Sequence, residues 1–118
     1  MRRNSVECAI AIVWPEGKAE PVCEMFRVDF ERMEWTSKHY SDGASFDDGG
    51  RLRDGETARS LAQLGTRSGI FRYSTAVTFV VADLDVARFD STRPTEWTVD
   101  DLARLPNADV SRHEPGHG

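Results

Sequence analysis

The feature that most constrains the fold is the stretch 70–82, IFRYSTAVTFVVA, which contains no glycine, proline or acidic residue. Its aromatic and β-branched side chains pack well on a pleated surface, so we expect one long strand at the centre of a sheet. Alternation places its odd-numbered residues on a core face. The other face begins with the polar Arg72 and Ser74 and becomes apolar near Val80, so we expect another element to cover only that end.

Two segments near the N-terminus predict strands that are joined as a hairpin. Residues 5–14, SVECAIAIVW, are apolar on both faces, which is typical of a strand inside a sheet. Pro15 and Gly17 then supply turn chemistry. Residues 22–35 alternate between apolar and charged side chains over 26–31, which indicates a second, half-buried strand. A helix is the alternative for this segment, because several of its apolar residues also fall at helical spacing.

The stretch 37–54, SKHYSDGASFDDGGRLRD, predicts a long loop. Gly, Ser and Asp dominate it and no period is visible. Loops of this length are uncommon in small domains and tend to be functional or mobile. A second irregular point follows the central strand, where Asp83 and Asp85 interrupt the apolar run. Beyond them, residues 86–89 are expected to continue the sheet as a bent or short strand.

Two short helices are expected, both on the apolar face of the sheet. The first covers residues 56–64 and ends at Gly65, which serves as its C-terminal cap. The second covers residues 98–105. Thr98 and Asp101 have the spacing of an N-terminal capping box, and an acidic residue in the first turn also suits the helix dipole.

Together these elements predict an α+β fold. Its antiparallel sheet has three to four strands, from the long N-terminal hairpin and the central strand 70–82, with two short helices packed on one face. We expect residues 1–106 to form a single compact domain and residues 107–118 to be a disordered tail, because the tail has little to bury. Homodimer formation through a sheet edge is a further hypothesis, because an exposed edge must be paired or shielded.

The charge of the chain is negative and unevenly distributed. The net charge is −5, and residues 77–118 hold eight acidic residues against four arginines. This acidic C-terminal third argues against nucleic-acid binding and permits a basic protein partner. No apolar run approaches the length that crosses a bilayer, so no membrane contact is expected. The first residues imitate a signal peptide, but Glu7 interrupts their apolar stretch, so a cytoplasmic location is expected.

Sequence patterns for catalysis or metal binding are weak in this chain. His113 to His117 matches H-E-x-x-H, but a proline and a glycine in its interior prevent a regular helix, so no metal site is predicted. Asp83 and Asp85 have a spacing that suits a divalent cation, although a structural turn is the preferred interpretation. Phosphate-loop, dinucleotide and nucleophile motifs are missing from the sequence, so we predict no cofactor and favour a non-enzymatic role.

The chain has two cysteines, Cys8 and Cys23. If the hairpin turn is tight they lie almost opposite each other, so a disulfide is geometrically possible. Free, buried thiols are the preferred interpretation for a cytosolic chain.

These observations favour a non-enzymatic protein-interaction module, such as a small acidic inhibitor or immunity-type protein. It would bind a partner through the 37–54 loop and the acidic C-terminal third. The alternatives are an oligomeric assembly subunit, or a small enzyme or ligand-binding domain with a sheet–helix pocket near His39, Arg72, Tyr73 and Asp83. Candidate binding residues come from the loop and from the acids after the central strand: His39, Tyr40, Asp42, Asp47, Asp48, Arg51, Asp83 and Asp85.

Overall fold

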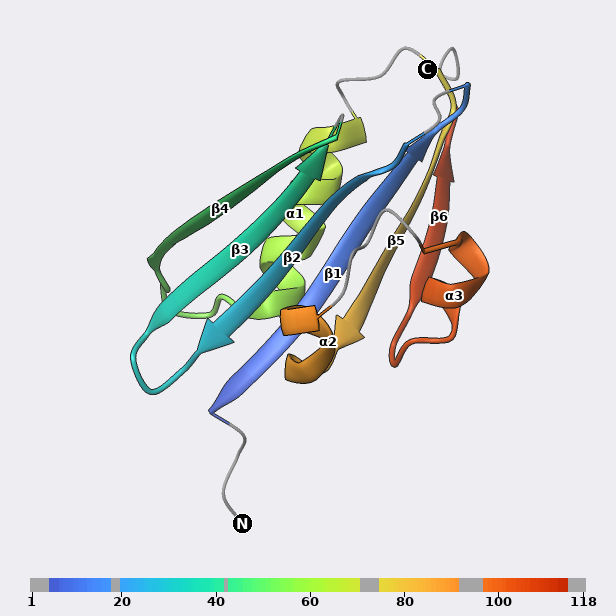
Figure 1. The fold of residues 1–118 in the computed structure, drawn as a ribbon. Helices are drawn as coiled ribbons and strands as arrows, with labels where there is room; N and C mark the ends of the chain where they lie inside the picture. Colours follow the sequence, from blue (N-terminus) through green and yellow to red (C-terminus); the bar gives the residue numbers. More distant parts are fainter. Residues whose placement is uncertain (1–4, 18–19, 42, 71–74, 92–96, 115–118) are drawn as a thin grey trace.

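A computed structural model describes residues 5–17, 20–41, 43–70, 75–91 and 97–114, without the side chains of 66–70. Its elements in chain order are β1 (Val6–Pro15), β2 (Val22–Asp29), β3 (Glu34–Ser41), β4 (Ala44–Arg51), α1 (Ala58–Ile70), β5 (Val77–Leu84), α2 (Val86–Ser91), α3 (Val99–Ala103) and β6 (Asp109–His113). All strands pair antiparallel in one sheet with the order β4-β3-β2-β1-β5-β6 (Figure 1). The predicted α+β class is confirmed, but the sheet has six strands where three to four were expected.

Strand β1 lies at the middle of the sheet and is buried on both faces. Ile10 and Ile12 are fully buried on one face, and Ala9 is fully buried on the other. The internal strand predicted over 5–14 is therefore confirmed. Its two apolar faces are needed because helices pack on both sides of the sheet.

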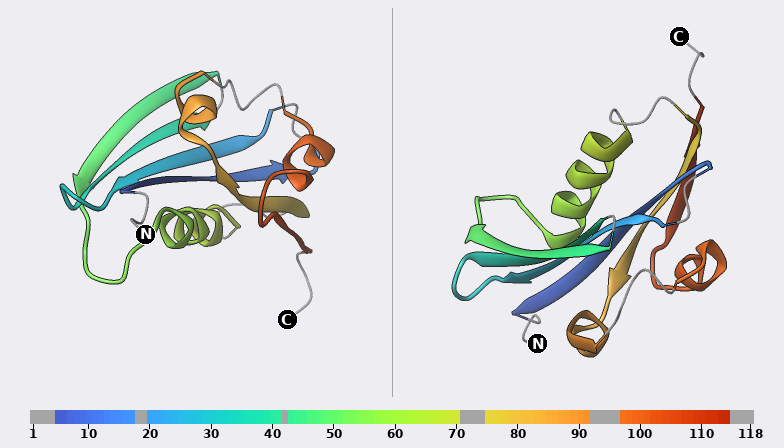
Figure 2. Two further views of the ribbon diagram at one scale, coloured as in Figure 1. Left: turned by 90° about the horizontal axis from the view of Figure 1, so that it is seen from below. Right: turned by 45° about the horizontal axis from the view of Figure 1, so that its top comes forward.

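The helices lie on opposite faces of the sheet (Figure 2). On one side, which we call the α1 face, Ala58 and Ala62 of α1 pack on Ala11 and Val81. On the other side, the α2–α3 face, helices α2 and α3 join a core around Ile10, Ile12 and Met25. The prediction that the helices pack on one face is wrong, because the central strands are apolar in both directions and each face needs its own cover.

The segment 22–35 does not form the single predicted strand or the alternative helix. The carboxylate of Asp29 accepts the backbone N–H groups of Glu31 and Arg32, at 3.0 and 3.1 Å, and this bends the chain. Met33 then takes a positive φ of 52°. The chain reverses at this turn and returns as β3.

The predicted 37–54 loop is also wrong, because most of it is the hairpin of β3 and β4. Gly43, with a φ of 76°, lies in the connecting turn. All eight residues of β4 are exposed, and β4 is one of the two edge strands of the sheet. Such a strand buries neither face, so its sequence carries no alternation. Its backbone pairing with β3 holds it in place.

Helix α1 is longer than predicted. At the start of the helix, the hydroxyl oxygen of Ser60 accepts the Thr57 backbone N–H, and the hydroxyl oxygen of Thr57 accepts the Ser60 backbone N–H. The helix continues through Gly65, the predicted cap, and through the predicted turn 66–69 to Ile70. Ile70 therefore belongs to the helix and does not begin the predicted strand, and β5 begins only at Val77. The remaining residues of the predicted strand's first half, 71–74, lie outside the described residues.

Two further corrections concern the C-terminal third. Residues 86–89 belong to helix α2 and not to a strand, because Oδ1 of Asp85 accepts the Arg88 N–H at 2.7 Å and starts a helix. Residues 109–113, in the tail predicted to be disordered, form β6 on the edge of β5. The capping box of Thr98 and Asp101 is confirmed at the start of α3. No helix in the described part of the chain is long and apolar enough to cross a membrane.

Candidate functional site

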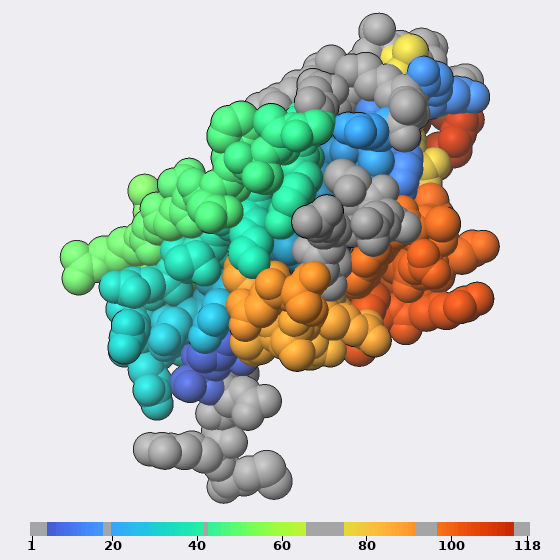
Figure 3. All heavy atoms as spheres, viewed as in Figure 1, coloured from blue at the N-terminus to red at the C-terminus, as the bar shows by residue number. Residues whose placement is uncertain are grey.

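The β3–β4 hairpin is the least covered part of the sheet. Helix α1 packs mainly on β1, β2 and β5, and so leaves the hairpin largely uncovered on that face. In the space-filling view the residues of β4 form one margin of the molecule (Figure 3). Phe46, on β4, is 60% exposed, which is unusual for an aromatic side chain in a strand.

One hydrogen bond shows which β4 residues direct their backbone groups to β3 and which direct them to the open edge. The Leu52 N–H donates to the Met33 oxygen at 2.8 Å, so these two residues form a hydrogen-bonded pair. Hydrogen-bonded and non-hydrogen-bonded pairs alternate along an antiparallel ladder, so the even-numbered residues of β4 bond to β3. The odd-numbered residues direct their N–H and C=O groups to the open edge: Ser45, Asp47, Gly49 and Arg51. In agreement, the Gly49 N–H is bonded to Oδ1 of Asp48, at 2.8 Å, and not to β3.

An apolar hollow lies beside this edge, on the α1 face. A cavity of about 580 Å³ is bordered by Trp35, Gly50, Leu52 and Leu61, and also by the charged Arg51, Arg53 and Glu56. A Cβ at Gly50 would lie 2.9 Å from Cζ2 of Trp35, so the indole ring occupies the space that a side chain at position 50 would need. A second cavity of about 430 Å³ adjoins the same tryptophan. Trp35 therefore forms the wall between two hollows at the end of the hairpin.

The structure places five of the predicted site residues on this hairpin. His39 and Tyr40 lie on β3, and Asp47, Asp48 and Arg51 lie on β4. Nδ1 of His39 is 2.9 Å from Oε1 of Glu24 on the neighbouring strand β2. The side chain of Tyr40 packs against the core of the α2–α3 face, and Asp42 lies outside the described residues.

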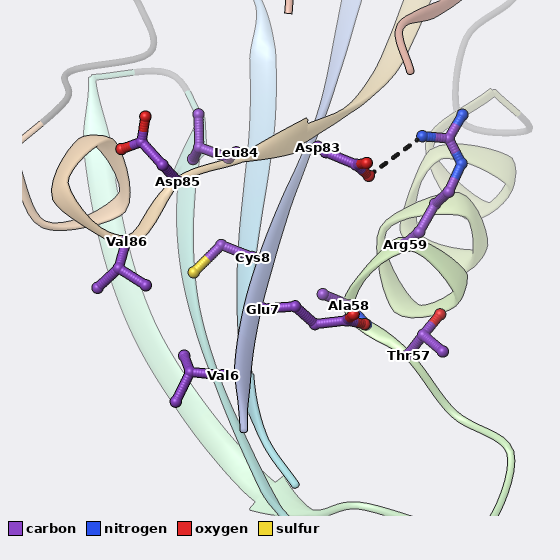
Figure 4. A pocket seen from close by; sticks show the side chains of 10 residues that line it. All are labelled: Val6, Glu7, Cys8, Thr57, Ala58, Arg59, Asp83, Leu84, Asp85 and Val86. Carbon is purple, nitrogen blue, oxygen red and sulfur yellow. Dashed lines mark hydrogen bonds and ion pairs between the residues drawn. The ribbon is translucent and has the colours of Figure 1, made fainter. Parts of the chain in front are cut away.

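Asp83 and Asp85 lie at a different place, around a cavity of about 500 Å³ at the end of β5 (Figure 4). Oδ1 of Asp83 is 3.4 Å from Nη1 of Arg59, and its Oδ2 accepts a hydrogen bond of 2.5 Å from Asn107. Asp85 caps α2 as described above. A third carboxylate in the cavity, Glu7, accepts the Ala58 N–H at 2.9 Å and so caps α1. All three carboxylates thus anchor helices or loops.

The pocket predicted near His39 and Asp83 does not form among the described residues. His39 is on β3 and Asp83 on β5, and β2 and β1 lie between them. Three strand spacings separate them by about 14 Å. Arg72 and Tyr73, the other two members of that pocket, lie outside the described residues.

The cysteines are free thiols, as predicted, but they are not opposite each other. Cys8 pairs with Arg27 and Cys23 with Ile12, so about 13 Å of strand separates them, too far for a disulfide. Burial raises the pKa of the Cys8 thiol to about 11 and raises the pKa of the Cys23 thiol well above its ordinary value. In the described part of the chain no three His, Cys, Asp or Glu side chains gather as a metal site.

The residues that sequence reasoning missed are Trp35, Phe46 and Gly50. A signal for them was present, because a glycine inside a strand often marks the close approach of another group. The predicted loop over 37–54 includes Gly49 and Gly50, and the signal applies only to a glycine in a strand. Comparison with protein-family models, with curated proteins and with solved structures finds no match for this chain.

Proposed function

We propose that this chain is a non-enzymatic protein-interaction module that pairs with an extended strand at the open edge of β4. The observation that carries the proposal is the exposure of all eight β4 residues, together with the outward backbone groups of every second one. Strand addition at such an edge draws its affinity from main-chain hydrogen bonds. Side chains beside the edge then select the partner.

Support for the proposal comes from the β3–β4 hairpin. The acidic C-terminal third, which was also expected to contact the partner, does not contribute to it. Strands β4 and β6 are at opposite edges of the sheet, about 24 Å apart, so one added strand cannot contact both. On β4, the exposed Asp47 suits a basic side chain on the added strand. An inhibitor or immunity-type role is one form that such a module can take.

Photo-cross-linking inside the source cell tests this function. A benzophenone amino acid replaces Ser45, which is exposed on β4; the control replaces Arg104, which is exposed next to α3. We expect a protein adduct from position 45 and none from position 104. Adducts from neither position, or only from position 104, would contradict binding at the β4 edge.

A further inference from the structure

We infer that the strand that β4 receives is β4 of a second copy of this chain, paired antiparallel about a two-fold axis at Gly49. The inference rests on the proposed function and names its partner. An axis of this kind is closed, so it yields a dimer with one continuous sheet of twelve strands.

The backbone restricts the registers that are open to such a pair. Only the odd-numbered residues of β4 present hydrogen-bonding groups to the edge, so an odd-numbered residue must lie opposite an odd-numbered one. With Gly49 opposite Gly49 of the second copy, Asp47 lies opposite Arg51 of the second copy. The bond from the Gly49 N–H to Asp48 is then exchanged for bonds across the axis.

Charge complementarity selects this register. Within one chain, Asp47 lies opposite Lys38 and Arg51 lies opposite Glu34. Pairing at Gly49 extends these pairs into a row that alternates in sign: Lys38, Asp47, then Arg51 and Glu34 of the second copy. The two-fold axis produces the row twice. Directly opposed charges of unlike sign stabilise a sheet.

The same register gives the exposed Phe46 an apolar neighbour. It places Phe46 opposite Leu52 of the second copy, on the α1 face. Leu52 borders the hollow of about 580 Å³ that Trp35 and Leu61 also line. Each copy therefore presents an exposed ring to the hollow of the other.

Registers shifted by two residues lose these contacts. A shift toward the hairpin turn places Asp48 opposite Asp48 of the second copy, which is repulsive. A shift the other way places Phe46 opposite Asp54 and leaves Arg51 opposite Gly49. The opposite edge of the sheet, β6, is shorter, and its Arg112 is already paired with Glu16 and Glu114.

Sedimentation velocity over a concentration series to about 500 µM tests the dimer. We expect reversible dimerisation of the natural chain, weakened at least about tenfold in Asp47→Arg and in Arg51→Asp, because each substitution opposes like charges twice. A mixture of these two variants should form a one-to-one dimer, because each restores the partner's missing charge. The double variant Asp47→Arg with Arg51→Asp should recover most of the dimerisation that either single variant loses, because it restores both charge pairs across the axis.

Asp48→Arg is the matched control, since it makes the same charge change one residue away, opposite Gly50 of the second copy. Its dimerisation should not fall more than about threefold below that of the natural chain, since the substitution also releases the Gly49 N–H that Asp48 bonds. A natural chain that stays monomeric, a mixture that fails to pair, or an equal loss in Asp48→Arg would overturn the inference.

The cross-linked adduct at position 45 distinguishes the dimer from the proposed function. A mass of two chains supports the dimer, and an adduct with another protein overturns it while the proposed function stands.

Discussion

The carboxylate of Glu24 on β2 lies against Gly65 on α1. It occupies the space that a side chain at position 65 would need. The same carboxylate contacts His39 on β3, with 2.9 Å between Oε1 and Nδ1. One glutamate therefore lies between a helix and two strands. Gly65 does not end the helix, because α1 continues to Ile70.

Gly65→Ala should change the free energy of unfolding by less than about 0.5 kcal/mol. The new methyl group displaces the carboxylate of Glu24 from His39, and the gain from replacing a helical glycine offsets the loss of this partly exposed contact. In a Glu24→Ala background only the gain should remain. There the alanine should add about 0.5–1 kcal/mol, as expected for a glycine replaced inside a helix. Urea unfolding followed by tryptophan fluorescence measures both differences. An equal gain in both backgrounds would show that the new methyl group does not disturb Glu24.

The elements that the sequence predicted well are those with a local signal. Strand β1 is apolar on both faces, and α3 carries its own capping box at Thr98 and Asp101. The end of α1 has no such signal. Gly65 is a typical helix stop, yet the helix continues through it to Ile70. The stretch that begins at Ile70 could not be divided between helix and strand, since short apolar runs suit both.

The sequence predicted several residues of the candidate site but not the secondary structure that holds them. His39, Asp47, Asp48 and Arg51 do lie together, yet on a hairpin and not on a loop. An exposed edge strand buries neither face, so its sequence lacks the alternation by which strands are recognised. Its position next to β3 depends on the turn at Asp29, whose two side-chain bonds no periodicity reveals.

Gly50→Ala should destabilise the hairpin, because the added Cβ would lie 2.9 Å from the ring of Trp35. Overpacking of this kind costs about 1–3 kcal/mol in free energy of unfolding. The tryptophan emission should also shift as the indole moves. Ser45→Ala, an exposed substitution on the same strand, is the control and should change neither quantity. A Gly50→Ala variant as stable as the control would contradict the contact.

The capping box predicts a difference between two adjacent aspartates. The Thr98 backbone N–H, hydrogen-bonded to Asp101, holds the pKa of that carboxyl below its ordinary value of 3.8. The contribution of Asp101 to stability is therefore present above pH 3.8 and is lost as the pH falls toward the lowered pKa. Asp101→Asn should flatten the stability profile in that acidic range. Asp100→Asn, in the same helical turn but outside the box, is the matched control and should alter the profile less than Asp101→Asn does. Urea midpoints between pH 2.5 and 6 on each variant, with about half-unit steps, provide the comparison.

The buried thiol of Cys8 predicts a loss of stability in alkali. Burial raises its pKa from 9.0 to about 11, so the folded chain keeps the proton in a pH range where the unfolded chain releases it. A group whose pKa is higher in the folded state contributes stability below the unfolded value, and that contribution falls as the pH rises from 9 to 11. The full loss is about 3 kcal/mol, from a rise of about two pKa units. Cys8→Ala should reduce the slope of stability against pH in this window, whatever its effect at pH 7. Parallel slopes for the variant and the natural chain would show that the thiol ionises equally in both states.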